Sequence, residues 1–389
     1  MMVRTGLEVF LESPPDWVRG KRLGLLCNPA SVDSNLVHSS IRVNKDLPEQ
    51  LACLLTPQHG YYGAQQHNMD ESEDMTHPTL GIPVYSLYSY TRVPNNRMLE
   101  KLDIILVDLQ DVGCRVYTFM YTMSYCMEVA RKLGKKVVVL DRPNPLGGRR
   151  IEGNLLHRSC ASFVGRFPIP MRHGMTMGEL ALYFNGPCKL GADVEVIQME
   201  GWDREMLWRD TGLEWVPPSP NLPTPESVLV YPGQVLWEGT NLSEGRGTAK
   251  PFEWFGAPYL DPNRLLDAPG MGTLSGCVFR PIAFIPKWSK WKEEQCMGLQ
   301  IHVTDPHRFQ PYMASLRLLQ AVMNNHPGGF AYSLPPYEYE YERRPIDLII
   351  GNQDVRKGLE AKKDPLDLEE AWMPGLHRFV ELSDSCRLY

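Results

Sequence analysis

The stretch DIILVDLQDVGCR, residues 103–115, joins a short and almost purely apolar run to a polar loop. Similar apolar runs occur in the first 200 residues at 22–28 (RLGLLCN), 51–55 (LACLL), 136–140 (KVVVL) and 194–199 (VEVIQM). Short apolar runs of this kind are typical of strands that are buried on both faces of a sheet. The sequence therefore predicts five such strands in the first half of the chain.

Segments with a helical spacing of apolar residues lie between these runs, notably 117–133 and 175–185. The second begins at Thr176 with Glu179 three residues later, the spacing of a capping box. Strands that alternate with helices indicate a parallel sheet with helices on both faces. We predict an α/β fold with a Rossmann-like, mostly parallel sheet.

Polar side chains follow four of the predicted strands, at the edge of the sheet where α/β proteins bind ligands. Asn28 follows the first strand and Gln58 and His59 follow the second. Two further groups follow the later strands: Asp108, Asp111 and Arg115, and Arg142 and Asn144. We expect an active-site cleft here, although Asp108 and Arg142 also suit a purely structural role.

The pattern of apolar, polar and proline residues changes in the second half of the sequence. Residues 214–226 (EWVPPSPNLPTPE) hold five prolines and predict an extended wall without regular structure, followed by a strand-like run at 228–237. After residue 248, β-rich runs at 277–285 and 299–304 accompany helical patterns at 309–324 and after 347. We predict a Rossmann-like domain over residues 1–247 and a smaller α+β domain over 248–389.

Composition excludes several classes of protein. The chain has 389 residues, with 40 Lys and Arg against 46 Asp and Glu, and no basic run of the kind that binds nucleic acid. No 18 apolar residues run together and the first residues carry charges, so we expect neither a membrane span nor a secretory leader. The nine cysteines contain no CxxC pair, which predicts reduced thiols and a cytoplasmic protein.

The segment 238–247 (EGTNLSEGRG) gathers Glu238 and Glu244 with Asn241 and Arg246 in a glycine-rich loop. Glycoside hydrolysis commonly uses two carboxyl groups, with polar neighbours that bind sugar hydroxyls. The alternatives are a solvated turn and a simple ion pair. Glu244 with Asp111 is the predicted catalytic pair, and Glu238 is a further candidate.

Arg172 and His173 precede a predicted helix start, where backbone amides and the helix dipole favour an anion such as a sugar carboxylate. The sequence has no HExxH motif, no phosphate-binding loop and no GxGxxG after the first strand, so we predict no metal and no cofactor. A metal-dependent hydrolase built on Asp108, Asp111, His59 and His173 is the competing interpretation.

Several sequence blocks, taken in order, resemble the bacterial exo-β-N-acetylmuramidase family over essentially the whole chain. These blocks are CNPASVD, PQHG, LVDLQDVGCRVYT, VVLDRPNPLGG, FPIPMRHGMTMGEL, WVPPSPNLPT and EGTNLSEGRGTAKPFEWFGAP. The resemblance implies a cleft between two domains and the release of terminal N-acetylmuramic acid from peptidoglycan fragments in cell-wall recycling. It implies a saccharide or muropeptide as partner, with Arg142 or Arg172 suited to the lactyl carboxylate of that sugar.

One position departs from the family pattern. The block PQHG resembles a family block PEHG, whose glutamate is a proposed catalytic carboxylate, and this chain has Gln58 there. An amide cannot donate a proton to a leaving oxygen as a carboxylic acid does. Glu71 and Glu244 are the predicted substitutes, and a catalytically silent sugar-binding protein is the alternative.

Overall fold

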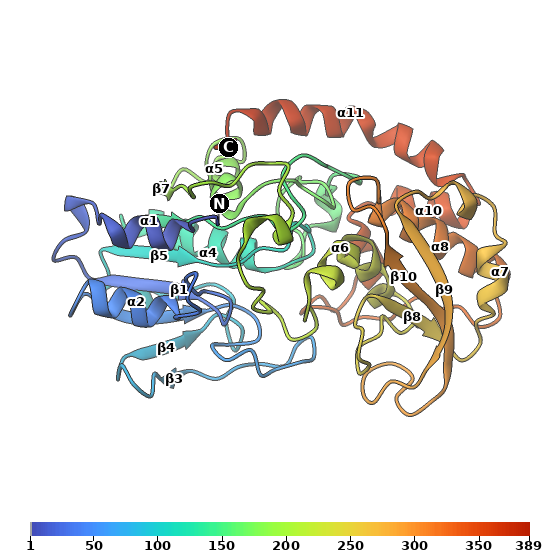
Figure 1. Cartoon of the computed structure of the whole chain (residues 1–389), viewed down its shortest axis with the longest axis horizontal. Helices are drawn as coiled ribbons and strands as arrows, with labels where there is room; N and C mark the ends of the chain where they lie inside the picture. The colour runs from blue at the N-terminus through green and yellow to red at the C-terminus, as the bar shows by residue number, and fades with distance from the viewer. Residues whose placement is uncertain (1) are drawn as a thin grey trace.

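The computed structural model describes residues 2–389 and contains two sheets, which lie side by side along the long axis of the molecule (Figure 1). The larger sheet has seven strands in the order β3-β4-β2-β1-β5-β6-β7, and all neighbours are parallel except β3 and β4. Its strands are β1 (Leu23–Cys27), β2 (Leu51–Thr56), β3 (Met75–Thr76), β4 (Pro83–Ser86), β5 (Ile104–Asp108), β6 (Lys136–Leu140) and β7 (Asp193–Ile197).

The five strands predicted from the sequence are β1, β2, β5, β6 and β7, so the mostly parallel α/β fold is confirmed. The short strands β3 and β4 at one edge have no strong apolar signal. The helices of this part are α1 (Gly6–Glu12), α2 (Ser39–Asp46), α3 (Asn96–Leu99), α4 (Phe119–Lys132) and α5 (Met177–Asn185), with 3₁₀ turns at Asp16–Val18, Arg158–Cys160 and Trp208–Thr211. The predicted capping box of Thr176 and Glu179 begins α5.

Helices cover both faces of the larger sheet, which explains why its central strands are apolar throughout. Alternate strand residues such as Leu25 and Leu106 pack with α1 and α2, whereas Leu26 and Val107 pack with α4 and α5. Burial of both faces removes the alternation of polar and apolar residues that a one-sided sheet would show.

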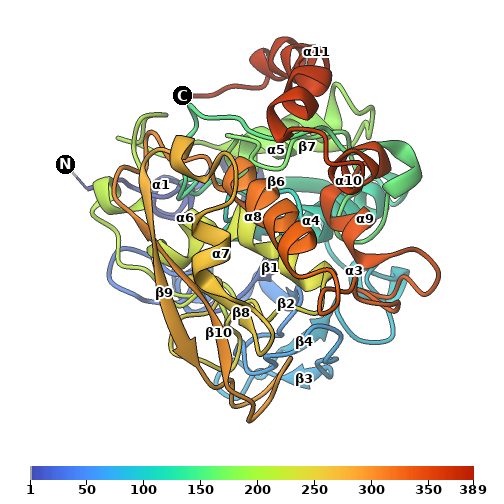
Figure 2. The same cartoon turned by 90° about the vertical axis from the view of Figure 1, so that its right-hand side faces the viewer.

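The second part of the chain surrounds the antiparallel sheet β8-β10-β9. Figure 2 shows β9 and β10 as a long ribbon, with α7 beside it. The strands are β8 (Trp254–Ala257), β9 (Cys277–Phe284) and β10 (Cys296–Val303). The helices are α6 (Pro225–Gln234), α7 (Pro262–Leu266), α8 (Pro311–Asn325), α9 (Pro345–Ile350), α10 (Gln353–Glu360) and α11 (Pro365–Asp384), with 3₁₀ turns at Val235–Gly239 and Met271–Thr273.

The prediction of a strand at 228–237 is wrong, because this segment forms α6 and the following 3₁₀ turn. Thr224 caps the helix by accepting a hydrogen bond from the Ser227 amide, and Pro225 occupies the first turn. A short apolar run that is buried all round has no periodicity to separate helix from strand. The boundary at residue 247 stays a prediction.

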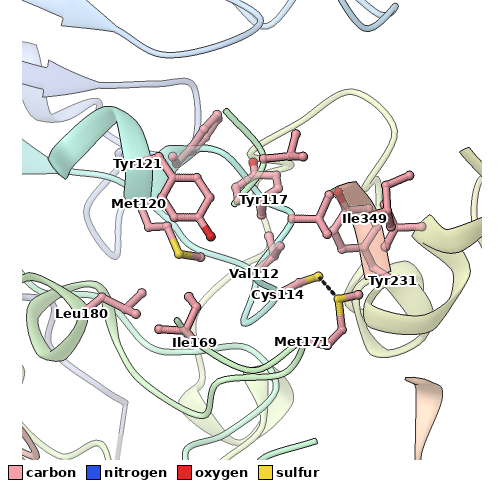
Figure 3. Packing of buried hydrophobic residues seen from close by; sticks show 14 of the residues in the cluster. Val112, Cys114, Tyr117, Met120, Tyr121, Ile169, Met171, Leu180, Tyr231 and Ile349 are labelled. Atoms are coloured by element: carbon pink, nitrogen blue, oxygen red, sulfur yellow. Dashed lines mark hydrogen bonds between the residues drawn. The ribbon is translucent and has the colours of Figure 1, made fainter. Parts of the chain in front are cut away.

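The apolar core continues from α4 and α5 into the second part of the chain. Figure 3 shows Tyr117 and Tyr121 on one side of this core and Tyr231 and Ile349 on the other. Helix α11 then runs back over the top of the molecule toward the larger sheet (Figure 1). Among residues 2–389, no helix has the length and apolar composition needed to cross a membrane.

Candidate active site

A narrow pocket lies where loops of the larger sheet meet the second part of the chain. Gln58 and His59 come from the loop after β2, and Thr118 ends the loop after β5. The opposite wall comes from later segments and includes Glu238, Arg246 and Glu338. The cavity volume is only about 30 Å³, enough for water but not for a sugar ring.

Asn68, in the loop between β2 and β3, also lines this pocket. The amide side chain of Asn68 donates to Glu238 (2.9 Å), and the backbone N–H of Met69 donates to the hydroxyl of Tyr88 (3.0 Å). The ring of His67 rests edge-on against Trp288, with ring centroids 4.5 Å apart. Because the pocket is this small, a sugar ring fits only if side chains that line it move.

Glu338 is a buried carboxyl group in the pocket, with 4% of its surface exposed. Its Oε1 accepts from Nε2 of Gln58 (3.0 Å) and its Oε2 accepts from the hydroxyl of Tyr88 (2.5 Å). Burial raises the pKa of Glu338 to about 7, the nearby charge of Glu238 adds to the rise, and the two hydrogen bonds oppose it. Glu338 can therefore hold or release a proton near neutral pH.

Glu238 is the second buried carboxyl group of the pocket and lies in a different environment. It accepts hydrogen bonds from Arg246 (2.7 Å), the hydroxyl of Tyr337 (2.6 Å) and Asn68 (2.9 Å). The ionised form, which only accepts hydrogen bonds, satisfies all three donors. The pocket thus contains one carboxylate beside a guanidinium and one carboxyl group that titrates near pH 7.

Gln58 is fixed by its neighbours on both sides of its amide. Thr118 donates to its Oε1 (2.9 Å), so its Nε2 points to Glu338 and to the hydroxyl of Tyr88 (3.1 Å). A glutamate at this position would place a second carboxyl group against Glu338. Gln58 instead donates a neutral hydrogen bond to it.

His59 lines the pocket with an uncharged imidazole ring. Its Nδ1 bonds the carbonyl of Gln65 (2.7 Å) and its Nε2 bonds the hydroxyl of Ser219 (3.1 Å). Burial lowers the pKa of His59 to about 4, so the ring is uncharged at neutral pH. His59 (φ +72°) and Glu338 (φ +47°) both have left-handed backbone conformations, which are uncommon for residues other than glycine and occur often at functional sites.

Of the predicted site residues, the pocket brings together Gln58, His59, Glu238 and Arg246. Glu244 lies behind Arg246, where it pairs with Lys290 at 3.0 Å. Burial alone would raise the pKa of Glu244, but the charges of Lys290 and Arg246 lower it. Glu71 is exposed, and its carboxylate accepts a long hydrogen bond from Tyr339 (3.4 Å).

The structure places the other predicted residues outside this pocket. Oδ2 of Asp111 accepts from the Gly113 amide (2.6 Å) and lies 3.2 Å from Nε2 of His173, so the structure does not pair Asp111 with Glu244. Arg142 forms a buried, two-pronged ion pair with Asp108 (2.6 and 3.0 Å).

Four further predicted residues hold backbone carbonyl groups in place. Arg115 is fully buried and donates to the carbonyls of Asn154, Ile169, Ile349 and Ile350. Asn28, Asn144 and Asn241 donate to the carbonyls of Pro218, Met175 and Gly329, respectively. Arg172 lines a different hollow. Among residues 2–389, no group of three or more His, Cys, Asp or Glu residues is arranged to hold a metal ion.

Glu338, Tyr337 and Asn68 are pocket residues that sequence reasoning missed. Glu338 and Tyr337 belong to the run PYEYEYERR at 336–344, where Tyr and Glu alternate as in a strand, although the structure forms only an isolated bridge between Tyr337 and Glu340 there. Gln58, the hydrogen-bond partner of Glu338, lies 280 residues earlier in the chain. The only signal was the crowding of Tyr and Glu residues in a short segment that begins with prolines.

The N-terminal family model of exo-β-N-acetylmuramidase NamZ matches residues 23–226, and the C-terminal model of the same family matches residues 229–389. The chain belongs to the NamZ family. The resemblance read from the sequence blocks is therefore confirmed.

Peptidoglycan β-N-acetylmuramidase NamZ of Bacillus subtilis (strain 168) is 44% identical over 389 residues, which cover all of this chain and 91% of that relative. Two solved NamZ-like folds are DUF1343 family proteins from Bacteroides fragilis NCTC 9343. One has a TM-score of 0.89 at 34% identity and the other a TM-score of 0.79 at 27% identity; each comparison covers all of this chain and 99% of the other.

Proposed function

We propose that this protein is an exo-acting glycoside hydrolase that releases terminal N-acetylmuramic acid from the non-reducing ends of peptidoglycan fragments. The observation that carries the proposal is the pairing of Glu238 and Glu338 in one pocket, in environments that separate their roles. Two carboxyl groups in different hydrogen-bonding environments are what acid–base cleavage of a glycosidic bond needs. Membership of the NamZ family supports the choice of sugar.

In the proposed reaction, Glu338 protonates the glycosidic oxygen as the bond to the sugar ring breaks, and the oxygen of a water molecule forms the new bond to the ring carbon while a proton of that water returns to Glu338. The carboxylate of Glu238 faces the positive charge that develops on the ring, and Arg246 and Tyr337 keep that carboxylate in place. Gln58 and Tyr88 orient Glu338. Gln58 is then a positioning residue, and the acid role that the family pattern gives to its position has passed to Glu338.

A second candidate function rests on Gln58 itself. If a carboxyl group at position 58 is indispensable for cleavage, the same pocket binds a muropeptide without hydrolysing it. The two functions differ in turnover but not in binding, so a kinetic assay separates them.

We further propose that the protein acts on wall fragments inside the cell. None of the nine cysteines, all within residues 2–389, is in a disulfide. Free thiols that are mostly buried are typical of proteins from reducing compartments. This location agrees with a role in peptidoglycan recycling.

The test is hydrolysis of a chromogenic N-acetylmuramide, with the matching N-acetylglucosaminide as comparison and EDTA in a parallel series. We expect turnover of the muramide that EDTA does not reduce and that Glu338→Gln lowers by roughly 10²–10⁴-fold. The matched control is Glu342→Gln, an exposed glutamate four residues away. Binding without turnover in the folded wild-type protein would favour the silent binder, and loss of activity with EDTA would favour a metal-dependent hydrolase.

A further inference from the structure

Four charged side chains of alternating sign run from the pocket to the hairpin loop 285–295, which joins β9 to β10. Nη2 of Arg246 donates to Oε1 of Glu238 (2.7 Å), and Nε of the same guanidinium lies 3.8 Å from Oε1 of Glu244. Oε2 of Glu244 in turn accepts from the ammonium of Lys290 (3.0 Å). We refer to these four residues as the charge row. Its two carboxylates and two cations leave no net charge when all four are ionised.

Lys290 is held in one position at the outer end of the charge row. An ammonium group has three donors, and Lys290 uses all of them. Besides Glu244, it donates to the carbonyl groups of Trp237 (2.6 Å) and Leu242 (3.0 Å). Its side chain is only 25% exposed. Water therefore screens its pairing with Glu244 much less than it screens a surface ion pair.

The backbone of the hairpin loop is shaped around Lys290. Ser289 (φ +71°) and Trp291 (φ +56°), the residues on either side of it, both have left-handed conformations, which are uncommon for residues other than glycine. Such conformations persist where the surrounding contacts fix them. The indole N–H of Trp291 donates to the carbonyl of Asn241 (2.6 Å), which ties the hairpin loop to the segment 238–247. The loop thus directs the lysine toward Glu244.

Arg246 lies between two carboxylates and makes a hydrogen bond to only one of them. It donates to Glu238, whereas its buried Nε has no hydrogen-bond partner among residues 2–389, although Glu244 lies close to it. Burial alone would lower the pKa of Arg246, but the charges of Glu238 and Glu244 raise it. The guanidinium could therefore pair with either carboxylate. Because Lys290 already neutralises Glu244, the charge of Arg246 remains available to Glu238.

We propose that Lys290 is a positioning residue that keeps Glu238 ionised, because it neutralises Glu244 and so reserves the charge of Arg246 for the pocket. The inference rests on the proposed function in one respect, namely that cleavage needs Glu238 ionised. Without Lys290, one guanidinium would face two carboxylates, and Glu238 would take up a proton at higher pH. Without the charge of Glu244, two cations would face Glu238, which would take up a proton at lower pH.

The other groups that face Glu238 do not account for such opposite shifts. Tyr231 and Tyr337 stay uncharged in acid, because burial raises the pKa of each hydroxyl. Glu338 is protonated below its pKa of about 7. His59 gains its charge near its pKa of about 4 and is the same residue in every variant compared, so its effect is common to all of them.

Carbon-13 NMR of the whole protein, labelled at the carboxyl carbon of glutamate, tests the proposal, and Glu238→Gln identifies the resonance of Glu238 by its loss. We expect the midpoint pH of this resonance to rise by at least about half a unit in Lys290→Met and to fall by a similar amount in Glu244→Gln. The double variant and Lys290→Arg, which keeps the charge, should both stay near the wild type. The acid limb of the pH–turnover profile should shift in the same directions.

The matched control is Lys287→Met, because Lys287 is an exposed lysine of the same hairpin loop that pairs with Glu293. It should leave the midpoint unchanged. A midpoint that does not rise in folded Lys290→Met, or does not fall in folded Glu244→Gln, would overturn the proposal, and each variant tests it even if the other does not fold. The NMR midpoint needs no turnover, so an inactive wild type would refute the hydrolase while the role of Lys290 is still tested.

Discussion

Replacing Glu338 by glutamine keeps the shape of the side chain and removes the group that titrates. The variant therefore tests the role of this residue through the pH dependence of stability and, independently, through turnover. In the folded protein the pKa of Glu338 is raised to about 7, from an ordinary value near 4.5. A raised pKa means that folding favours the protonated form. The contribution of the Glu338 carboxyl group to the free energy of unfolding is therefore fully present below about pH 4.5 and is lost as the pH rises through about 7.

The size of this loss follows from the shift, which corresponds to about 3 kcal/mol. Glutamine does not titrate, so the difference in the free energy of unfolding between wild type and Glu338→Gln should change by about 3 kcal/mol between pH 4 and pH 8. The variant should be relatively more stable at the higher pH. Urea unfolding at several pH values measures this difference.

In the proposed mechanism, the same group should set the alkaline limb of the pH–turnover profile. Only the protonated form donates to a leaving oxygen, so turnover by the wild type should fall about tenfold for each pH unit well above 7. The Glu338→Gln variant should lose roughly 10²–10⁴-fold in turnover at pH 6. A stability difference that is flat with pH, together with undiminished turnover, would refute the reasoning.

Three further predictions concern Glu238 and Gln58 in the pocket and Arg142 outside it. Glu238→Gln should lower turnover at least about 10²-fold, with little change in the alkaline limb of the pH–turnover profile. A shifted limb would instead mean that Glu238 is the acid and Glu338 the carboxylate that faces the positive charge. Gln58→Glu adds a carboxyl group beside Glu338, so the alkaline limb of the pH–turnover profile should move to higher pH. Higher turnover with an unchanged limb would indicate that the residue at position 58, and not Glu338, is the acid. Arg142→Met leaves Asp108 buried without its partner and should cost roughly 3–5 kcal/mol in urea unfolding, while the preference for muramide over glucosaminide stays the same.

The larger sheet could be predicted from the sequence because burial on both faces leaves a local signature in each strand. The helical state of segment 228–237 could not be predicted, because a fully buried helix and a fully buried strand both give a short apolar run in the sequence. Its helical state depends on the cap at Thr224 and on packing against α8 and β10.

The candidate site was predictable where a local pattern marks its residues, as the loop after β2 marks Gln58 and His59. Glu238 and Arg246 lie eight residues apart in one glycine-rich loop, and they bind each other in the structure. Glu338 depends on a contact with Gln58 across 280 residues, which no local pattern encodes. A polar loop at a strand end does not by itself separate a site residue from a structural one, since the guanidinium of Arg142 is bound by Asp108 in the structure.

The most direct test of the central claim is incubation of the wild-type protein with a disaccharide of N-acetylmuramic acid linked to N-acetylglucosamine, with the products identified by mass spectrometry. The account predicts release of N-acetylmuramic acid from the non-reducing end, unaffected by EDTA, retained in Glu342→Gln and lost in Glu338→Gln. An intact disaccharide after incubation with folded wild-type protein that binds it would contradict the claim.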